Sequence, residues 1–179
     1  IVGAPDDDPG GVVNAGSAQV FLRVFGMPAM PNTWNPEPTG TLVAPDAAAG
    51  DAFGRSVAFG GARAFVGAPR DGATGSVRVF LLASMVWAQQ AALVVAGASF
   101  LGQAVSASSA GDRVAAYSSL GVIVFLRSGV TWPQEATLAV GAPFALTTDG
   151  AFVLGSATGG MRAVNRTGTT WTAESGLLV

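Results

Sequence analysis

A strand-like motif of the form Gly-Ser-x-x-Val-Phe-Leu recurs along the chain, and it restricts the fold more than any other feature. Two close copies begin at Gly16 and Gly75, a third begins at Gly121, and a weaker fourth begins at Gly160. Apolar residues bounded by glycine are typical of β-strands joined by tight turns. A strand that recurs in this way indicates small units that each pack on their neighbours.

The four tryptophans of the chain each come after one copy of this motif. A leucine comes six residues after each tryptophan, or eight residues after it in the first unit. Because one aromatic recurs in one register, we predict that the tryptophans and the motif phenylalanines pack between units; a set of sugar-stacking surfaces is the alternative. The predicted packing residues are Trp34, Trp87, Trp132, Trp171, Phe21, Phe80 and Phe125, and the leucines are Leu42, Leu93, Leu138 and Leu177.

A second signal precedes the motif and is clearest in the second unit. It consists of Phe53-Gly54, a turn at Gly60-Gly61, and Gly67-Ala68-Pro69. Consecutive glycines between apolar runs favour tight hairpins, because such turns need positive φ angles. Each full unit then has four short strands. The segment 140–143 also contains Gly-Ala-Pro, but its register places it in the link between the last two units.

Four-stranded units of this length predict an all-β fold, a partial β-propeller with about four four-stranded antiparallel blades, of which the first lacks its first strand. The chain is expected to form one domain, residues 1–179, with approximate repeats at 1–48, 49–97, 98–141 and 142–179. Because Ile1 falls inside a unit, we expect a piece of a longer propeller, whose remaining blades are partners of this one. It is either an open arc from a larger ring or a nearly complete four-bladed ring.

Phe53-Gly54 together with Gly67-Ala68-Pro69 resembles the FG-GAP repeat, which is found in integrin α propellers and in bacterial surface proteins. The resemblance implies an extracellular or cell-surface module for adhesion or ligand binding, of the bacterial kind. It also implies calcium in some members, held by acidic residues in the hairpin between the first and second strands. Those hairpins here contain at most one carboxylate each, for example Asp112 or Asp149, so we expect no calcium and no other cofactor.

The composition excludes several classes of chemistry. The chain has no histidine and no cysteine, which removes the commonest general base and metal ligand and any thiolate nucleophile. Its net charge is −2 with no basic run, so nucleic acid is not expected as a partner. Carboxylates such as Asp51 and Asp71 have no spacing that indicates catalysis. The apolar stretch 79–101 is interrupted by glutamines, so no membrane span is expected.

These observations predict a non-catalytic extracellular interaction module that binds a protein or glycan. A lectin-like propeller with tryptophan-lined pockets, or an accessory domain of a secreted hydrolase, are the alternatives. The acidic run Asp6-Asp7-Asp8 is interpreted as a solvated turn, with a weak calcium contact as the alternative. Arg78 and Arg162 share a position that is Ile123 in the third unit, and we predict that this position is variable surface.

Overall fold

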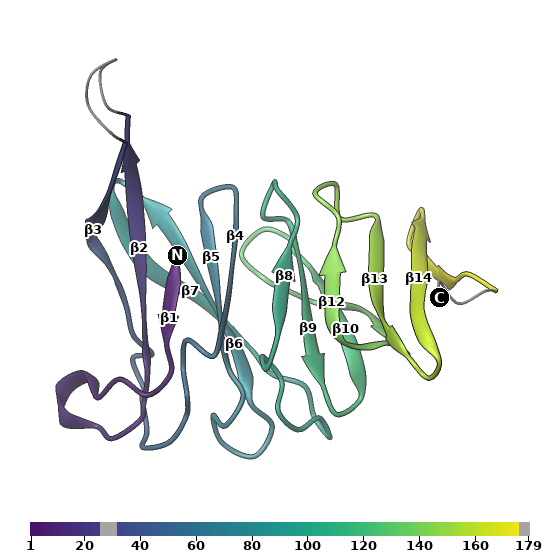
Figure 1. The fold of residues 1–179 in the computed structure, drawn as a ribbon, viewed down its shortest axis with the longest axis horizontal. Coiled ribbons are helices and arrows are strands. Elements are labelled where there is room, and N and C mark those ends of the chain that lie inside the picture. Colours follow the sequence, from purple (N-terminus) through teal and green to yellow (C-terminus); the bar gives the residue numbers. More distant parts are fainter. Residues whose placement is uncertain (26–31, 176–179) are drawn as a thin grey trace.

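The computed structural model describes residues 1–25 and 32–175, and within these ranges the chain forms fifteen strands in four antiparallel sheets and no α-helix (Figure 1). This confirms the prediction of an all-β partial propeller in which the first unit has three strands and each of the other three units has four. In every sheet the strands are ordered as they occur in the chain, so each sheet is a simple meander. None of the described helices is long and apolar enough to cross a membrane.

Each sheet is built from consecutive strands of the chain. The first sheet contains β1 (Val2–Ala4), β2 (Ser17–Val24) and β3 (Thr33–Leu42), with a short 3-10 turn η1 (Pro9–Gly11) between the first two. The second contains β4 (Ser56–Gly60), β5 (Arg63–Ala68), β6 (Ser76–Ala83) and β7 (Val86–Leu93). The third contains β8 (Val105–Ala107), β9 (Arg113–Ser118), β10 (Gly121–Leu126) and β11 (Gln134–Leu138). The fourth contains β12 (Gly141–Leu146), β13 (Phe152–Ala157), β14 (Gly160–Thr167) and β15 (Thr170–Ala173).

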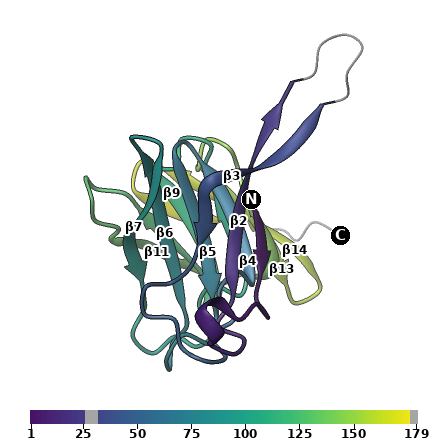
Figure 2. The ribbon, with the colours of Figure 1, turned by 90° about the vertical axis from the view of Figure 1, so that its left-hand side faces the viewer.

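The sheets stand in a row, face against face, so that the chain forms an open arc with its two ends at opposite sides (Figure 1). The view from the first sheet shows the others stacked behind it (Figure 2). The first strands β4, β8 and β12 are neighbours across successive sheets. The arc therefore has the blade arrangement of a propeller without ring closure among the described residues.

Each boundary between sheets in the described part of the chain is filled by one cluster of buried apolar residues. Strands alternate their side chains between two faces, so each inner sheet contributes to two clusters. On β5, for example, Val66 faces the first sheet and Phe65 faces the third. The sheets thus have no core of their own, and the stability of each depends on the neighbour that covers it.

Segment 140–143 differs from the sequence interpretation. β12 begins at Gly141, so most of this segment belongs to a strand and not to the link between units. Gly141 pairs with Ser156 and Phe144 pairs with Gly155, which leaves Ala142 and Pro143 as a bulge. Proline cannot donate a ladder hydrogen bond, and a bulge accommodates it inside a strand. The motif Gly-Ala-Pro therefore has a different structural role here.

The two signature glycines meet between sheets, which explains why the motif needs them. The α-carbon of Gly67, on β5, lies so close to the third sheet that a Cβ there would overlap the carbonyl oxygen of Gly102. Gly3 has the same relation to Gly54 of the following sheet. A glycine of one sheet therefore packs against the backbone of the next sheet, at two successive boundaries.

Candidate binding cleft at the lower loop edge

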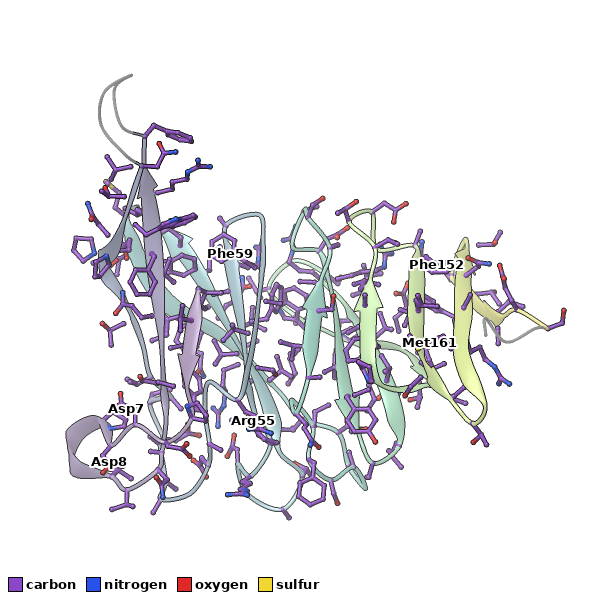
Figure 3. The ribbon with its side chains drawn as sticks, viewed as in Figure 1. Asp7, Asp8, Arg55, Phe59, Phe152 and Met161 are labelled. Carbon is purple, nitrogen blue, oxygen red and sulfur yellow. The ribbon has the colours of Figure 1, made fainter. Side chains whose placement is uncertain are left out.

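Loops of two kinds meet at the lower edge of the arc: those that join β1 to β2 and β5 to β6, and those that lead from one sheet into the next. Figure 3 places Asp7, Asp8 and Arg55 at this edge, and Phe59 and Phe152 toward the opposite one. The loops occupy residues 5–16, 43–55, 69–75 and 94–104. We call this region the lower loop edge.

A cleft of about 390 Å³ opens at the lower loop edge, where loops of the first three sheets converge. Its lining comes from equivalent positions of successive repeats, which occur in pairs. The four pairs are Pro5 with Pro69, Asp6 with Arg70, Ala52 with Phe100, and Arg55 with Gln103. The repeat therefore builds the walls, while the differences within each pair set the chemical character of the cleft.

The backbone holds one of these pairs in an uncommon conformation. Ala52 has a φ of 55° and Phe100 has a φ of 58°, both in the left-handed region. Each residue directly precedes the buried residue of its repeat, Phe53 or Leu101, whose N–H donates to a carbonyl of the preceding unit (Phe53 N to Ala15 O 2.9 Å, Leu101 N to Thr74 O 3.0 Å). Because the backbone is fixed by these bonds, the side chain of Phe100 projects into solvent and is 56 % exposed.

The charged groups of the cleft are exposed and available to a ligand. In the part of the chain that the structure describes, the guanidinium groups of Arg55 and Arg70 make no hydrogen bond or ion pair. The carboxylate of Asp6 also lines the cleft. Two guanidinium groups, a carboxylate, an amide and an aromatic ring can recognise a ligand by charge, hydrogen bonding and stacking.

The aspartates of the acidic run next to the cleft contact different groups. Asp7 accepts a hydrogen bond from Ser17 Oγ at 2.7 Å, and Asp8 accepts one from the backbone N–H of Asn14 at 2.7 Å. Asp71 accepts the equivalent bond from Ser76 in the second unit, so Asp7 has the role of a repeat position. Among residues 1–25 and 32–175, no group of three or more acidic, histidine or cysteine side chains is arranged to hold a metal ion.

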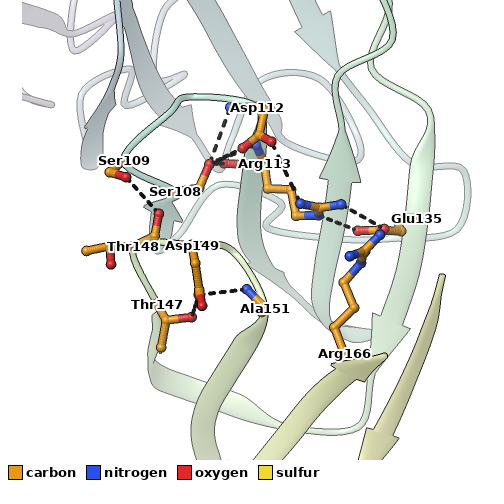
Figure 4. Close-up of polar contacts among 10 residues, drawn as sticks. All are labelled: Ser108, Ser109, Asp112, Arg113, Glu135, Thr147, Thr148, Asp149, Ala151 and Arg166. Carbon is orange, nitrogen blue, oxygen red and sulfur yellow. Dashed lines mark hydrogen bonds and ion pairs between the residues drawn. The ribbon is translucent and has the colours of Figure 1, made fainter. Parts of the chain in front are cut away.

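The hairpins at the opposite edge, where the FG-GAP resemblance would place calcium, are joined to one another, and Figure 4 shows the contact between the third and fourth sheets. Gly61 N donates to Ser109 O at 2.7 Å, and Ser109 N donates to Thr148 O at 2.8 Å. The Ser109 hydroxyl donates to the same Thr148 oxygen at 2.9 Å. Three successive hairpins therefore form one hydrogen-bonded series that ties the second, third and fourth sheets together.

Glu135 binds the third sheet to the fourth near this edge (Figure 4). Its carboxylate accepts from Arg113 Nε at 3.0 Å and from Arg166 Nε at 2.9 Å. Burial alone raises the pKa of Glu135, but the hydrogen bonds and charges of the two arginines outweigh burial and hold the pKa below its ordinary value. A carboxyl group with a depressed pKa stabilises the fold above its ordinary pKa, and the contribution is lost as the pH falls through the depressed value.

The substitution Glu135→Gln, which resembles the protonated acid, should lower the free energy of unfolding by about 3 kcal/mol at neutral pH. The figure is at the low end for a buried ion pair because Arg166 is partly exposed. Below about pH 4.5, the ordinary pKa of the group, the difference should begin to shrink, and the two proteins should converge once the pH has fallen through the depressed pKa of Glu135. Urea unfolding at several pH values measures the difference; a gap that stays constant down to pH about 3 would contradict this role of the charge.

The prediction for Arg78 is wrong. This residue on β6 is only 5 % exposed and is not variable surface. Its Nη1 and Nη2 atoms bind both oxygens of Asp46, at 3.0 and 3.1 Å, and Nη2 also binds Asp71. Burial lowers the pKa of Arg78, but the two aspartates outweigh it and the pKa is raised. Ile123 tolerates the same environment because the position is interior, where either an apolar side chain or a fully paired charge fits.

The predicted packing residues fall into two groups. Trp87 and Trp132 are buried in the clusters that they share with the preceding sheets. Trp132 meets Phe65 of the preceding sheet edge to face at a centroid distance of 5.4 Å, and Trp87 meets Phe59 of its own sheet edge to face at 5.7 Å. Trp171 is partly buried and packs against the cluster between the third and fourth sheets. The predicted packing residues that are buried also include Phe80, Phe125, Phe53, Gly54, Gly67, Ala68 and Pro69. Leu177 lies outside the described residues.

The packing prediction does not hold for Trp34. This side chain is 64 % exposed and, with Ile1, Val2 and the partly buried Phe21, lines an apolar hollow on the outer face of the first sheet. Its equivalents Trp87 and Trp132 each face the preceding sheet. The first sheet has no preceding sheet among the described residues, so the same position is left exposed.

Sequence reasoning missed the cleft itself. It treated Gly54 and Pro69 as packing positions and did not consider the residues beside them. Arg55 comes directly after Gly54, and Arg70 directly after Pro69. Residues that follow the repeat signatures lie at one edge of the fold. An arginine directly after Phe53-Gly54 and another directly after Gly67-Ala68-Pro69 are therefore the sequence signal that could have indicated the cleft.

Comparison with known proteins supports the repeat assignment. The model of the FG-GAP repeat matches residues 37–80, a segment that runs from β3 to β6 and includes both Phe53-Gly54 and Gly67-Ala68-Pro69. No curated protein matches the chain. The match lies on the boundary between the first and second sheets, where the signature glycines meet the neighbouring backbone. The chain therefore contains an FG-GAP repeat, at residues 37–80, within a partial propeller.

Proposed function

We propose that this chain is part of a non-catalytic interaction module, located outside the cell or at its surface, whose lower loop edge binds a ligand. The observation that carries the proposal is the cleft between the first three sheets, where Arg55, Arg70 and Phe100 are exposed and where the two guanidinium groups have no partner among the described residues. FG-GAP repeats are typical of extracellular proteins, which supports the location. The buried repeat positions hold the frame, and the loops between them carry recognition.

The side chains of the cleft favour recognition over catalysis. Its polar groups are two guanidinium groups, the carboxylate of Asp6 and the amide of Gln103. Three carboxylates adjacent in sequence to cleft residues are engaged elsewhere: Asp7 accepts from Ser17 Oγ, Asp51 accepts from the Ala48 N–H at 2.8 Å, and Asp71 is paired with Arg78. We therefore propose that binding needs neither a cofactor nor a metal.

The tryptophan-lined lectin receives no support from the burial of the aromatic residues. Trp87 and Trp132 are 8 % and 7 % exposed, so their rings are covered by protein and cannot stack on a sugar. The indole Nε1 atoms of both also lie inside the boundaries and have no hydrogen-bond partner in the described part of the molecule. No feature of the described residues favours the hydrolase-accessory alternative.

The proposal is tested by displaying the chain to arrays of extracellular proteins and of oligosaccharides, with and without a chelator. We expect specific binding that the chelator leaves unchanged and that the triple substitution of Arg55→Gln, Arg70→Gln and Phe100→Ala weakens by at least about tenfold. Substitution of Arg127→Gln, an exposed arginine at the opposite edge, is the matched control. Absence of binding on both arrays, or binding that the lower-edge substitutions do not change, would refute the proposal.

A further inference from the structure

We infer that the cleft of Arg55, Arg70 and Phe100 binds an acidic peptide segment, with one aspartate or glutamate side chain held between the two guanidinium groups. This inference rests on the proposed function and adds the chemical class of the ligand. It is carried by three features of the cleft: its unpaired cations, its apolar wall and its single carboxylate.

Arg55 and Arg70 line the cleft together and have no carboxylate partner among the described residues, unlike the three arginines that form ion pairs. Arg78, Arg113 and Arg166 are each neutralised by aspartate or glutamate of the chain. Arg55 and Arg70 face the same cleft, and no ion pair to either is found within the described residues. A guanidinium group presents a planar fork of donors that matches a carboxylate, and charge-assisted bonds of this kind are stronger than neutral ones.

The apolar wall favours a peptide over an acidic sugar. Half of the lining residues are apolar, and of these the exposed Phe100 and the partly exposed Pro5 offer most of the surface for an aliphatic or aromatic side chain. A sugar ring would need partners for several hydroxyl groups, and only Asp6 and Gln103 remain for them after the arginines bind the acid. Exposed aromatic rings and arginines are the residues most often found at the centre of protein interfaces.

The carboxylate of Asp6 limits which acidic segments fit. It can accept a hydrogen bond from a backbone N–H of the ligand, but it repels a second acidic side chain placed beside the first. With two cations and one anion lining the cleft, one ligand carboxylate is the charge that balances it. We therefore expect a single acid flanked by apolar residues to bind better than a run of acids.

The experiment uses an array of short peptides with blocked termini, each containing one Asp or Glu beside an apolar residue, and a matched array with Asn or Gln in its place. We expect the acidic members to bind and their amide partners to bind at least about tenfold more weakly. For the best peptide, calorimetry should show a loss of about tenfold for Arg55→Gln and for Arg70→Gln, and less than about twofold for Arg127→Gln. Raising the salt from about 50 to 500 mM should weaken binding.

Both cleft arginines are exposed, so their glutamine variants should unfold at the wild-type temperature, and a loss of binding then reports on the site. Peptide binding without preference for the acid, or without sensitivity to Arg55 and Arg70, overturns the inference. So does binding by uronic-acid oligosaccharides alone, or the failure of every peptide. In those cases the proposed function would still hold if the protein or oligosaccharide arrays identified another ligand whose binding depends on the lower loop edge.

Discussion

Replacing Trp87 with alanine should lower the free energy of unfolding by about 3–5 kcal/mol, the range for large aromatic residues in a packed core. The side chain is 8 % exposed and fills the boundary between the first and second sheets, in edge-to-face contact with Phe59. Its removal leaves a cavity at this boundary, because the facing sides of the two sheets are packed by this one cluster. Urea unfolding of the whole chain, monitored by far-ultraviolet circular dichroism, measures the change.

The matched control is Trp34→Ala, the same repeat position in the first sheet. Trp34 is 64 % exposed, so its removal should change stability by less than about 1 kcal/mol. Trp87→Phe should recover most of the loss, since the indole Nε1 of Trp87 has no hydrogen-bond partner among the described residues and only ring volume is reduced. Equal losses of stability at Trp34 and Trp87 would show that coverage by a neighbouring sheet does not determine how much a tryptophan at this position stabilises the fold.

The same pair shows how far the sequence could predict the fold. The regular placement of the tryptophans indicated repeat units, and the strand pattern indicated four strands in each full unit; the structure has both. The register could not reveal that Trp34 is exposed, because burial at this position comes from the preceding sheet and not from local sequence. A repeat motif predicts a contact surface, while the neighbour that covers the surface is a property of the assembly.

Charged residues were predicted less well than apolar ones. Arg78 was assigned to the surface because its position also contains isoleucine in another unit, but both are buried. Its partner Asp46 is in a link segment 32 residues earlier in the chain, and such a pairing leaves no periodic trace in the sequence. Glu135 and Arg166 are likewise joined only through the contact of two sheets. Ion pairs across repeats depend on three-dimensional register, which strand patterns do not contain.

The candidate cleft could be predicted from the sequence only in part. Its walls are repeat positions and could be predicted to share one edge, since Pro5 and Pro69 are equivalent, as are Ala52 and Phe100. Its specificity comes from the differences within these pairs, such as aspartate at position 6 and arginine at position 70. A search for residues that recur between repeats identifies the residues that pack the sheets together. It overlooks the candidate binding residues, because these lie at positions where the equivalent residues differ in charge or size.

Replacing Gly67 with alanine should be among the most damaging single-methyl changes in the chain, with an expected loss of about 3 kcal/mol or more. The added Cβ would overlap the carbonyl oxygen of Gly102 in the segment that enters the third sheet, and a backbone atom cannot rotate away as a side chain can. The two sheets would have to separate along their boundary, which also loosens the contact between Phe65 and Trp132.

The control for this substitution is Gly97→Ala, in the link before the third sheet. Gly97 has a φ of 77° and no atom within 4 Å of the added Cβ, so alanine there costs only the conformational penalty of about 1 kcal/mol. Unfolding of both variants in urea separates the steric effect between sheets from the general effect of replacing a glycine. If Gly67→Ala loses no more than Gly97→Ala, the sheets are not in close backbone contact, and the explanation of the repeat signature by glycine packing fails. A loss specific to Gly67 would show that the signature is maintained by the distance between neighbouring sheets, so that a blade with Gly-Ala-Pro at the end of its second strand needs a glycine at the facing position before the next blade.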